Sequence, residues 1–262
     1  MKPRFFAKFV SWLVAALLIL PVAVVIPMSF SGRSTFEFPP TSWSLRWYIN
    51  LFQAPQWTFA LSNSLKVAVL TALISTVIGT MATVGLARLS RRISGFATSA
   101  ILLPLIIPNI LVALAVYATF LTLQLNGTII GLVLADTAIA LPFVVIAVNT
   151  RLKGIDDRLR IAALTLGATP FAAFRQVVLP LLWPGIVSAV VLSFVTAFDE
   201  VIIALFLQTP ANTVLSVQMF NAVSIEIDPT ISAASSVLVV VVSAAILVGQ
   251  VIFTKRRGAK SQ

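Results

Sequence analysis

The sequence has no cysteine and no histidine among its 262 residues. Without cysteine, the chain cannot form disulfide frameworks or thiolate-bound metal sites. Without histidine, it lacks the commonest metal ligand and the commonest general base. These absences argue against metalloenzymes and against hydrolases that use a histidine-containing triad.

Charge is also scarce, whereas apolar residues are abundant. Charged residues make up 10% of the chain and hydrophobic residues 59%, and the mean hydropathy is +1.05. These values lie outside the usage of soluble globular proteins and predict a polytopic membrane protein. The sequence also lacks the Gly-x4-Gly-Lys-Ser/Thr phosphate loop, so we do not expect this chain to hydrolyse ATP by that route.

The net charge of +10 raises the possibility of nucleic-acid binding, but the distribution of the basic residues argues against it. Fifteen of the 18 Lys and Arg residues fall before the first apolar run, in two later loops and in the tail. This is the positive-inside pattern of membrane topology, not a phosphate-binding stripe. The fifteen are Lys2, Arg4, Lys8, Arg88, Arg91, Arg92, Arg151, Lys153, Arg158, Arg160, Arg175, Lys255, Arg256, Arg257 and Lys260.

The apolar runs predict an all-α membrane protein with six transmembrane helices in a single domain, residues 1–262. Both termini would be cytoplasmic, because a five-span chain would leave one strongly basic terminus outside. We expect the first run to be retained, since no convincing cleavage site follows it. Pro104 and Pro108 would interrupt the third span and Pro142 the fourth. The predicted spans are about 9–29, 61–87, 98–123, 127–149, 184–207 and 230–253.

The loop at 150–182, between spans four and five, has the pattern of two short helices with a tight corner. Gly167 suits the left-handed position that ends a helix, and Thr169 with Pro170 would start the next one. Phe171 and Phe174 would form one protruding apolar edge. We interpret this loop as a docking surface for a soluble partner; the alternative is an amphipathic helix on the membrane surface.

Three acidic residues, Asp136, Asp199 and Glu200, fall within the predicted spans. A carboxylate there costs several kcal/mol unless it faces water, the bundle interior or a partner. The carboxylates of Asp199 and Glu200 would point about 100° apart on a helix. Two readings stay open, a path for a cationic substrate and a polar contact that packs helices together.

The loop resembles the cytoplasmic EAA loop of permease subunits in binding-protein-dependent ABC importers, of the MetI-like superfamily. That pattern is Glu-Ala-Ala, three residues, Gly, nine residues and Ile-x-Leu-Pro. Val177 stands for its Ile, and Ile161 replaces its Glu, which puts in doubt an ionic contact with the ATPase. The matching residues are Ala162, Ala163, Gly167, Leu179 and Pro180.

The remaining sequence is similar to the second permease subunit of spermidine/putrescine importers, in three segments: 39–48, 63–65 and 198–206. The resemblance implies a bacterial inner-membrane protein that forms a heterodimer with a homologous permease. It also implies two copies of an ATPase, which would bind ATP and Mg, and a periplasmic binding protein. This chain would hold no cofactor and no metal, and would contact membrane lipid but no nucleic acid.

Other functions remain possible at this point. Related importers carry ferric iron, 2-aminoethylphosphonate or other small solutes. A self-sufficient secondary transporter or channel is a second class, although no inverted repeat is evident and the structured loop would then have no purpose. A membrane-embedded enzyme is disfavoured by the lack of histidine, cysteine and clustered catalytic carboxylates.

Overall fold

A computed structural model of the chain describes residues 3–258, with side chains described for residues 7–244. The described residues form helices joined by turns and loops, with no β-strand among them. The predicted all-α secondary structure is therefore confirmed for the described residues. Lys2 and Lys260, which the charge argument used, lie outside the described residues. The chain divides into two compact units, Met1–Thr58 with Gln218–Gln262 and Phe59–Val217.

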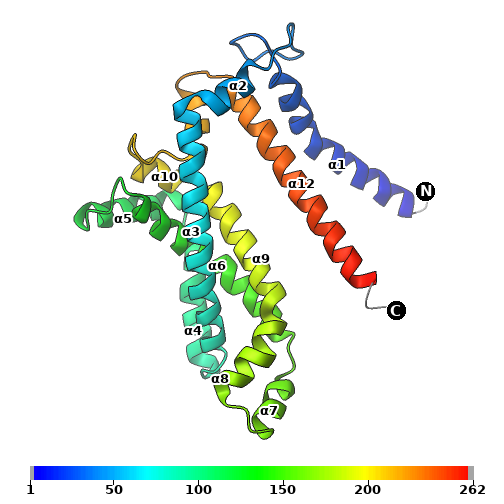
Figure 1. Cartoon of the computed structure of the whole chain (residues 1–262), viewed down its shortest axis with the longest axis vertical. Helices are drawn as coiled ribbons and strands as arrows, with labels where there is room; N and C mark the ends of the chain where they lie inside the picture. The colour runs from blue at the N-terminus through cyan, green and yellow to red at the C-terminus, as the bar shows by residue number, and fades with distance from the viewer. Residues whose placement is uncertain (1–2, 259–262) are drawn as a thin grey trace. The chain divides into compact units, whose positions relative to one another are not determined.

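In the first unit, α1 (Pro3–Met28) and α2 (Arg46–Gln53) both contact α12 (Thr230–Gly258) (Figure 1). Two long-range hydrogen bonds join residues 50 and 57 to the chain near the start of α12. Asn50 Nδ2 donates to Thr230 Oγ1 over 2.8 Å, and the buried Trp57 donates from Nε1 to Asp228 Oδ2 over 3.1 Å. Asp228 Oδ1 also accepts from the Thr230 N–H, so one carboxylate organises this end of α12.

The second unit contains α3 (Pro55–Leu86) from residue 59 onward, α6 (Ile129–Lys153) and α9 (Leu179–Phe198). Glycines permit close contact between these helices. A Cβ built on Gly79 would lie 2.5 Å from Val144 Cγ1, and one on Gly185 would lie 2.7 Å from Arg151 Cβ. Arg151 also donates from Nε to the Leu181 carbonyl over 2.9 Å, which ties α6 to the start of α9.

The predicted third span is not one straight helix. It consists of α4 (Arg91–Leu102), the 3₁₀ turn η1 (Leu103–Leu105) and α5 (Asn109–Thr122), with a bend of 98° between residues 105 and 109. Pro104 and Pro108 flank the break, as expected for residues that cannot donate a helical hydrogen bond. By contrast, α6 continues without a break through the buried Pro142, so the predicted interruption of span four is wrong.

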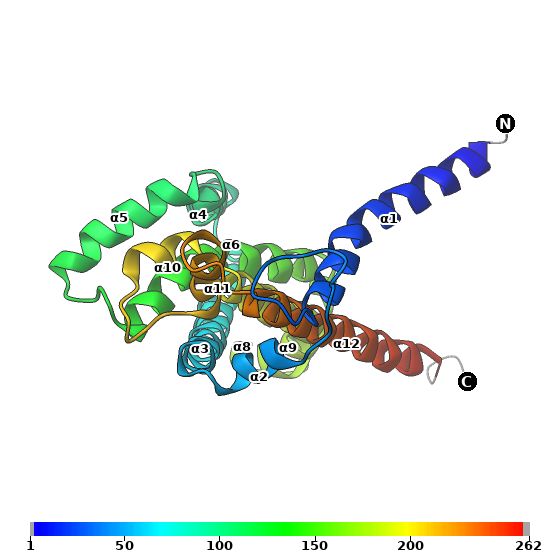
Figure 2. The same cartoon turned by 90° about the horizontal axis from the view of Figure 1, so that it is seen from above.

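The α5 helix packs against α10 (Ile202–Leu207), and both views show the two side by side (Figure 2). The α10 helix also contacts α6. The apolar core of this unit lies among these helices and α3. Its buried members are Val67, Ala113, Leu132, Val133, Ala135, Ile139, Ile203, Ala204, Leu207, Val214 and Val217.

Among the described residues, four helices are long and apolar enough to cross a membrane, or five if the bent pair is one span. They are Ala7–Met28, Pro55–Leu86, Ile129–Lys153 and Pro170–Phe198, with Arg91–Leu105 plus Asn109–Thr122 as the bent pair. The apolar segment Thr230–Ala244 is shorter. The chain is therefore a polytopic helical protein by length and composition.

The shorter elements are α7 (Asp157–Thr165), α8 (Pro170–Ala173), the π-helical turn η2 (Phe174–Val178) and α11 (Leu215–Ser224). Of these, α7, α8 and η2 occupy the predicted docking loop. The fold around them determines which of their side chains are exposed.

Candidate coupling site

A tight corner ends α7, and its backbone hydrogen bonds explain the glycine at position 167. The Gly167 N–H donates to the Leu164 carbonyl and the Ala168 N–H to the Ala163 carbonyl, both over 3.0 Å. This pair of bonds is the Schellman motif, which requires a left-handed residue at its turn. Gly167 has φ = +90°, so the predicted left-handed glycine is confirmed.

The second helix of the loop starts as predicted but does not remain short. Thr169 accepts from the Ala172 N–H over 3.2 Å, and Pro170 occupies the first turn. The chain then passes through η2 directly into α9, so that Leu179 and Pro180 lie at the start of the long helix. Proline cannot donate to the preceding turn, and a widened π turn precedes it. The loop predicted to extend to residue 182 therefore ends at Thr169, where the continuous helical run Pro170–Phe198 begins.

An apolar surface, here called the corner surface, is exposed around the turn. Leu166 is 89% exposed and Phe171 is 72% exposed, and Ile161 and Ala162 are exposed on the outer side of α7. Phe174 differs, because it is half-buried against the core residues Val144, Val148, Val178, Leu182 and Ala189. The prediction that Phe171 and Phe174 form one protruding edge is therefore wrong. Phe171 protrudes, whereas Phe174 faces the core.

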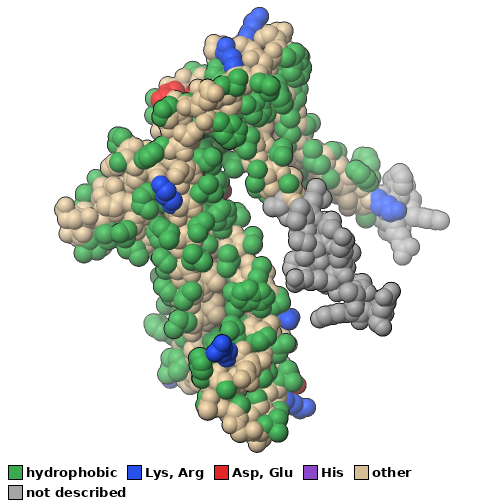
Figure 3. Space-filling model, in the orientation of Figure 1, with side chains coloured by type: hydrophobic (Ala, Val, Ile, Leu, Met, Phe, Trp, Pro, Cys, Tyr) green, Lys and Arg blue, Asp and Glu red, His purple; other side chains and the backbone are tan. Residues whose placement is uncertain are grey.

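The surface of the second unit changes character toward this corner. Hydrophobic side chains cover most of the visible face along α3 and α9, and several Lys and Arg side chains lie at the end that carries α7 and α8 (Figure 3). Such a change is expected where apolar spans leave the hydrocarbon layer on the basic side.

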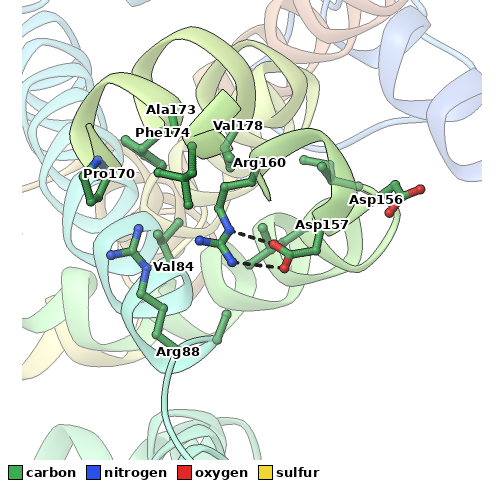
Figure 4. Close-up of a pocket in the computed structure, with 13 residues that line it drawn as sticks. Val84, Arg88, Asp156, Asp157, Arg160, Pro170, Ala173, Phe174 and Val178 are labelled. Atoms are coloured by element: carbon green, nitrogen blue, oxygen red, sulfur yellow. Dashed lines mark hydrogen bonds and ion pairs between the residues drawn. The ribbon is translucent and has the colours of Figure 1, made fainter. Parts of the chain in front are cut away.

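Behind the corner, a cavity of about 490 Å³ separates α7 from the ends of α3 and α6 (Figure 4). Arg88 reaches it from the residues after α3, and Arg160 from α7. A Cβ on Gly167 would meet no atom within 4 Å. The corner is therefore held by its own hydrogen bonds and not by close packing around Gly167. The other cavity-lining residues include Val84, Leu152, Ile155, Asp156, Asp157, Leu164, Pro170, Ala173, Phe174 and Val178.

A short ion pair stiffens α7 beside the cavity. Arg160 Nε and Nη2 donate to Asp157 Oδ1 and Oδ2 over 2.7 and 3.0 Å. These hydrogen bonds lower the pKa of Asp157 below its ordinary value. The pair is solvent-exposed, so its contribution to stability is small. Because the pKa is lowered, that contribution is present above the unfolded pKa of aspartate and is lost as the pH falls through the folded value.

We expect Arg160→Gln to return the pKa of Asp157 to its ordinary range, because both charged hydrogen bonds are removed. A carboxyl-carbon NMR titration, with the resonance assigned by Asp157→Asn, would measure this change. Arg158→Gln is the matched control, because Arg158 is an exposed neighbour on α7 with no ion pair among the described residues. An Asp157 pKa that stays low in Arg160→Gln would contradict the assigned cause.

The predicted fifth span, 184–207, is two helices, and the break falls at the acidic pair. The α9 helix ends at Phe198 and α10 begins at Ile202. Asp199 and Glu200 therefore lie between two helices, and the prediction that they share one helix is wrong. Glu200 is 8% exposed, and its Oε2 accepts from the N–H groups of Ile203 and Ala204 over 2.8 and 3.1 Å. Asp199 is exposed at the end of α9. The pair therefore divides into a buried capping group and an exposed carboxylate.

Asp136 lies on the buried face of α6. It is 4% exposed, and its Oδ1 has no hydrogen-bond partner among the described residues. The α6 helix packs against α10, which Glu200 caps. Asp136 is therefore enclosed by helices of its own unit.

Three polar residues that sequence reasoning did not assign hold the segment after α10 in place. Asn63 donates from Nδ2 to the Thr213 carbonyl over 3.1 Å, and Ser64 Oγ accepts from the Leu215 N–H over 2.7 Å. Ser216 donates from its hydroxyl to the Glu200 carbonyl over 2.7 Å. The signal for the first two was the similarity of segment 63–65, which did not by itself indicate a partner.

Comparison with known proteins gives one family. A family model described as "Binding-protein-dependent transport system inner membrane component" matches residues 75–256. The spermidine/putrescine transport system permease protein PotC of Escherichia coli strain K12 is 30% identical over 237 residues, covering 90% of this chain and 89% of that protein. The putrescine transport system permease protein PotI of the same strain is 29% identical over 226 residues, covering 83% and 80%.

The fold has a counterpart among solved structures. A chain of a bacterial ABC transporter involved in the import of the acidic polysaccharide alginate superposes with a TM-score of 0.72 at 16% identity, covering 96% of this chain and 95% of that one. At this identity the similarity concerns the fold alone. The family match over most of the sequence, with 30% identity to PotC, shows that the chain belongs to the family of inner-membrane components of binding-protein-dependent transport systems.

Proposed function

We propose that the chain is a permease subunit of a bacterial ATP-driven importer, that its substrate is a polyamine such as putrescine or spermidine, and that it forms half of the translocation path. The substrate class is supported by the 30% identity to a spermidine/putrescine permease over 90% of the chain. The observation that carries the transport mechanism is the exposed corner surface held on a Schellman turn.

The proposed topology has six spans, at about 9–29, 61–87, 98–123, 127–149, 184–207 and 230–253 in the sequence, with both termini in the cytoplasm. Together they would form a single transmembrane domain over residues 1–262. The third of these spans would be the bent pair and the fifth would end near Phe198. The clustering of the basic residues supports this orientation in the inner membrane, with the corner surface on the cytoplasmic side.

The proposed partners follow from the family and from the chemistry that this chain lacks. A homologous second permease would complete the path as a heterodimer, and a periplasmic binding protein would deliver the solute. Two copies of an ATPase would bind ATP and Mg, since this sequence has no phosphate loop. The corner surface is proposed to dock in the ATPase, with contributions from Ile161, Ala162, Ala163, Gly167, Phe171, Phe174, Leu179 and Pro180. Of these, Phe174 and Leu179 would act through packing, because they are half-buried.

For the path, Asp199 is the strongest candidate. An exposed carboxylate at the C-terminal end of a helix interacts unfavourably with the helix dipole, so fold stability does not explain its presence. A carboxylate in this position would attract a polycation. Glu200 and Asp136 are proposed to act on the path indirectly, by fixing the packing of the helices around it, since both are buried.

The docking proposal is tested by Leu166→Asp. Leu166 is 89% exposed, so the substitution should leave folding intact and introduce a charge into an apolar contact. We expect copurification of the ATPase with the membrane-extracted chain to fall by roughly tenfold or more, about 1.4 kcal/mol of binding. Quantitative immunoblotting of both subunits would measure the ratio.

Ile225→Asp is the matched control, because Ile225 is also an exposed aliphatic residue but lies after α11. It should retain the ATPase at the unmodified level. If Leu166→Asp keeps the ATPase, the corner surface is not the docking surface. If the unmodified chain never retains an ATPase, the importer proposal itself fails.

A further inference from the structure

A second cavity, of about 660 Å³, lies between the end of α3, the start of α4 and the end of α6. One face of each helix lines it, since the lining positions recur at helical spacing: 83 and 86 on α3, 91, 94, 95 and 98 on α4, and 145, 149, 152 and 153 on α6. Ala87 and Leu89, in the turn after α3, complete the lining. This cavity is distinct from the one behind the corner, although Ala87 and Leu152 border both.

Positive charge in this cavity is not neutralised by any acidic residue in the part of the chain that the structure describes. Arg91 and Lys153 line it, no acidic residue does, and neither forms an ion pair among the described residues. The side chains of Ser94, Thr98 and Asn149 also line it, are half-buried, and make no hydrogen bond within residues 7–244. Two cations and three polar groups therefore converge on a space that holds no chain atom.

The apolar part of the lining indicates what kind of anion would fit. Leu86, Leu89, Val145 and Leu152 border the same space. The cavity also lies where two candidate spans end: Pro55–Leu86 is followed by Arg88, and Ile129–Lys153 has Arg151 and Lys153 in its last turn. At the end of a span, charged phosphate groups of the membrane lie next to the hydrocarbon layer. A soluble anion would make no use of the leucine and valine side chains.

We propose that this cavity binds the phosphate headgroup of an anionic membrane phospholipid, with its acyl chains against the apolar wall. Arg91 and Lys153 would neutralise the phosphate, and Ser94, Thr98 and Asn149 would donate hydrogen bonds to its oxygens. The cytoplasmic leaflet as the source rests on the proposed orientation of the chain. Headgroup binding itself does not depend on the transported solute.

The test uses a pair of variants that differ in charge alone. A Cβ on Gly95 would meet no atom within 4 Å, so Gly95→Asp and Gly95→Asn both fit into the cavity wall. The importer complex containing the full chain would be reconstituted in nanodiscs with mixed phosphatidylglycerol and phosphatidylcholine. Native mass spectrometry would then count the phosphatidylglycerol that stays bound after detergent extraction. We expect Gly95→Asp to retain about fivefold less than Gly95→Asn, the effect of one charge near the membrane surface.

A second pair removes the cations. Arg91→Gln with Lys153→Gln should reduce phosphatidylglycerol retention by at least about fivefold. Arg92→Gln should leave it unchanged, because Arg92 is exposed beside Arg91 but does not line the cavity. Equal retention by Gly95→Asp and Gly95→Asn overturns the proposal, as does equal retention of phosphatidylglycerol and phosphatidylcholine by the unmodified complex.

A final arm separates the lipid from free phosphate. Inorganic phosphate alone should neither protect the detergent-extracted complex against heating nor displace bound phosphatidylglycerol. Protection or displacement by inorganic phosphate would assign the cavity to a soluble anion and overturn the lipid proposal. Lipid retention is measured without solute uptake, so failure here and failure of the polyamine proposal are separate results.

Discussion

Gly167→Val is expected to lower solute uptake at least about tenfold while the chain stays in the membrane. Gly167 has φ = +90°, which a β-branched residue adopts only with strain of about 1–3 kcal/mol. A new Cβ there meets no atom within 4 Å, so the expected effect comes from the backbone and not from a clash. The turn would relax, Leu166 and Phe171 would lose their relative placement, and ATP hydrolysis would no longer drive transport. Uptake of labelled polyamine would measure the loss of transport, and substrate-stimulated ATPase activity would measure whether ATP hydrolysis continues without it.

Gly154→Val serves as the matched control. Gly154 is the C-cap of α6, just before α7, but has φ = −86°, and its added Cβ would meet the Arg151 carbonyl at 3.5 Å, an ordinary contact. This variant should transport at close to the unmodified rate. Normal coupling in Gly167→Val would show that the left-handed turn is dispensable, and the corner would then not be the coupling element.

The acidic pair provides the second large effect, because its two members should respond differently. Glu200→Ala leaves the buried N–H groups of Ile203 and Ala204 without an acceptor, at about 1–3 kcal/mol each. We expect this variant to lower the amount of folded chain in the membrane severalfold. Glu200→Gln keeps one acceptor oxygen and should retain most of it. Immunoblotting of the detergent-soluble fraction would measure the difference.

Asp199→Asn should instead preserve the amount of chain and reduce polyamine uptake by roughly fivefold, the effect of about 1 kcal/mol of charge attraction in water. The reduction should shrink at high salt, because exposed charges are screened. An uptake defect that follows Glu200→Gln and spares Asp199→Asn would reverse the proposed roles. Unchanged uptake in both variants and in their double mutant would leave the pair with packing roles only.

The corner could be predicted from the sequence because the residues that determine it are neighbours in the chain. A Schellman turn needs a left-handed residue after the last helical turn, and Gly167 meets that need without help from the rest of the fold. The start of α8 is local in the same way, because the Thr169 side chain accepts from the Ala172 N–H and Pro170 occupies the first helical position. The burial of Phe174 could not be predicted in this way, because it depends on α6 residues such as Val144 and Val148, which are distant in the sequence.

The break at Asp199 was missed for a related reason. Hydropathy alone joins 184–207 into one apolar run, and only the partners of Glu200 and Ser216 show that the chain turns there. Likewise, Pro104 and Pro108 predicted an interruption, but the 98° bend also reflects the packing of α5 against α10. Pro142 shows the converse, since a proline enclosed by neighbouring helices can be accommodated without a break. Proline therefore predicts where a helix can bend, and its neighbours decide whether it does.

The direct passage from α8 through η2 into α9 has a mechanical consequence. Pro170–Phe198 is a run of 29 helical residues without a loop, so it is about 40 Å long. One end carries Phe171 and the other is followed by Asp199. If a run of this length tilts as one body by about 5°, its far end moves by roughly 4 Å. A small displacement at the end where the ATPase is proposed to dock would thus be transmitted by leverage to Asp199, the proposed path residue.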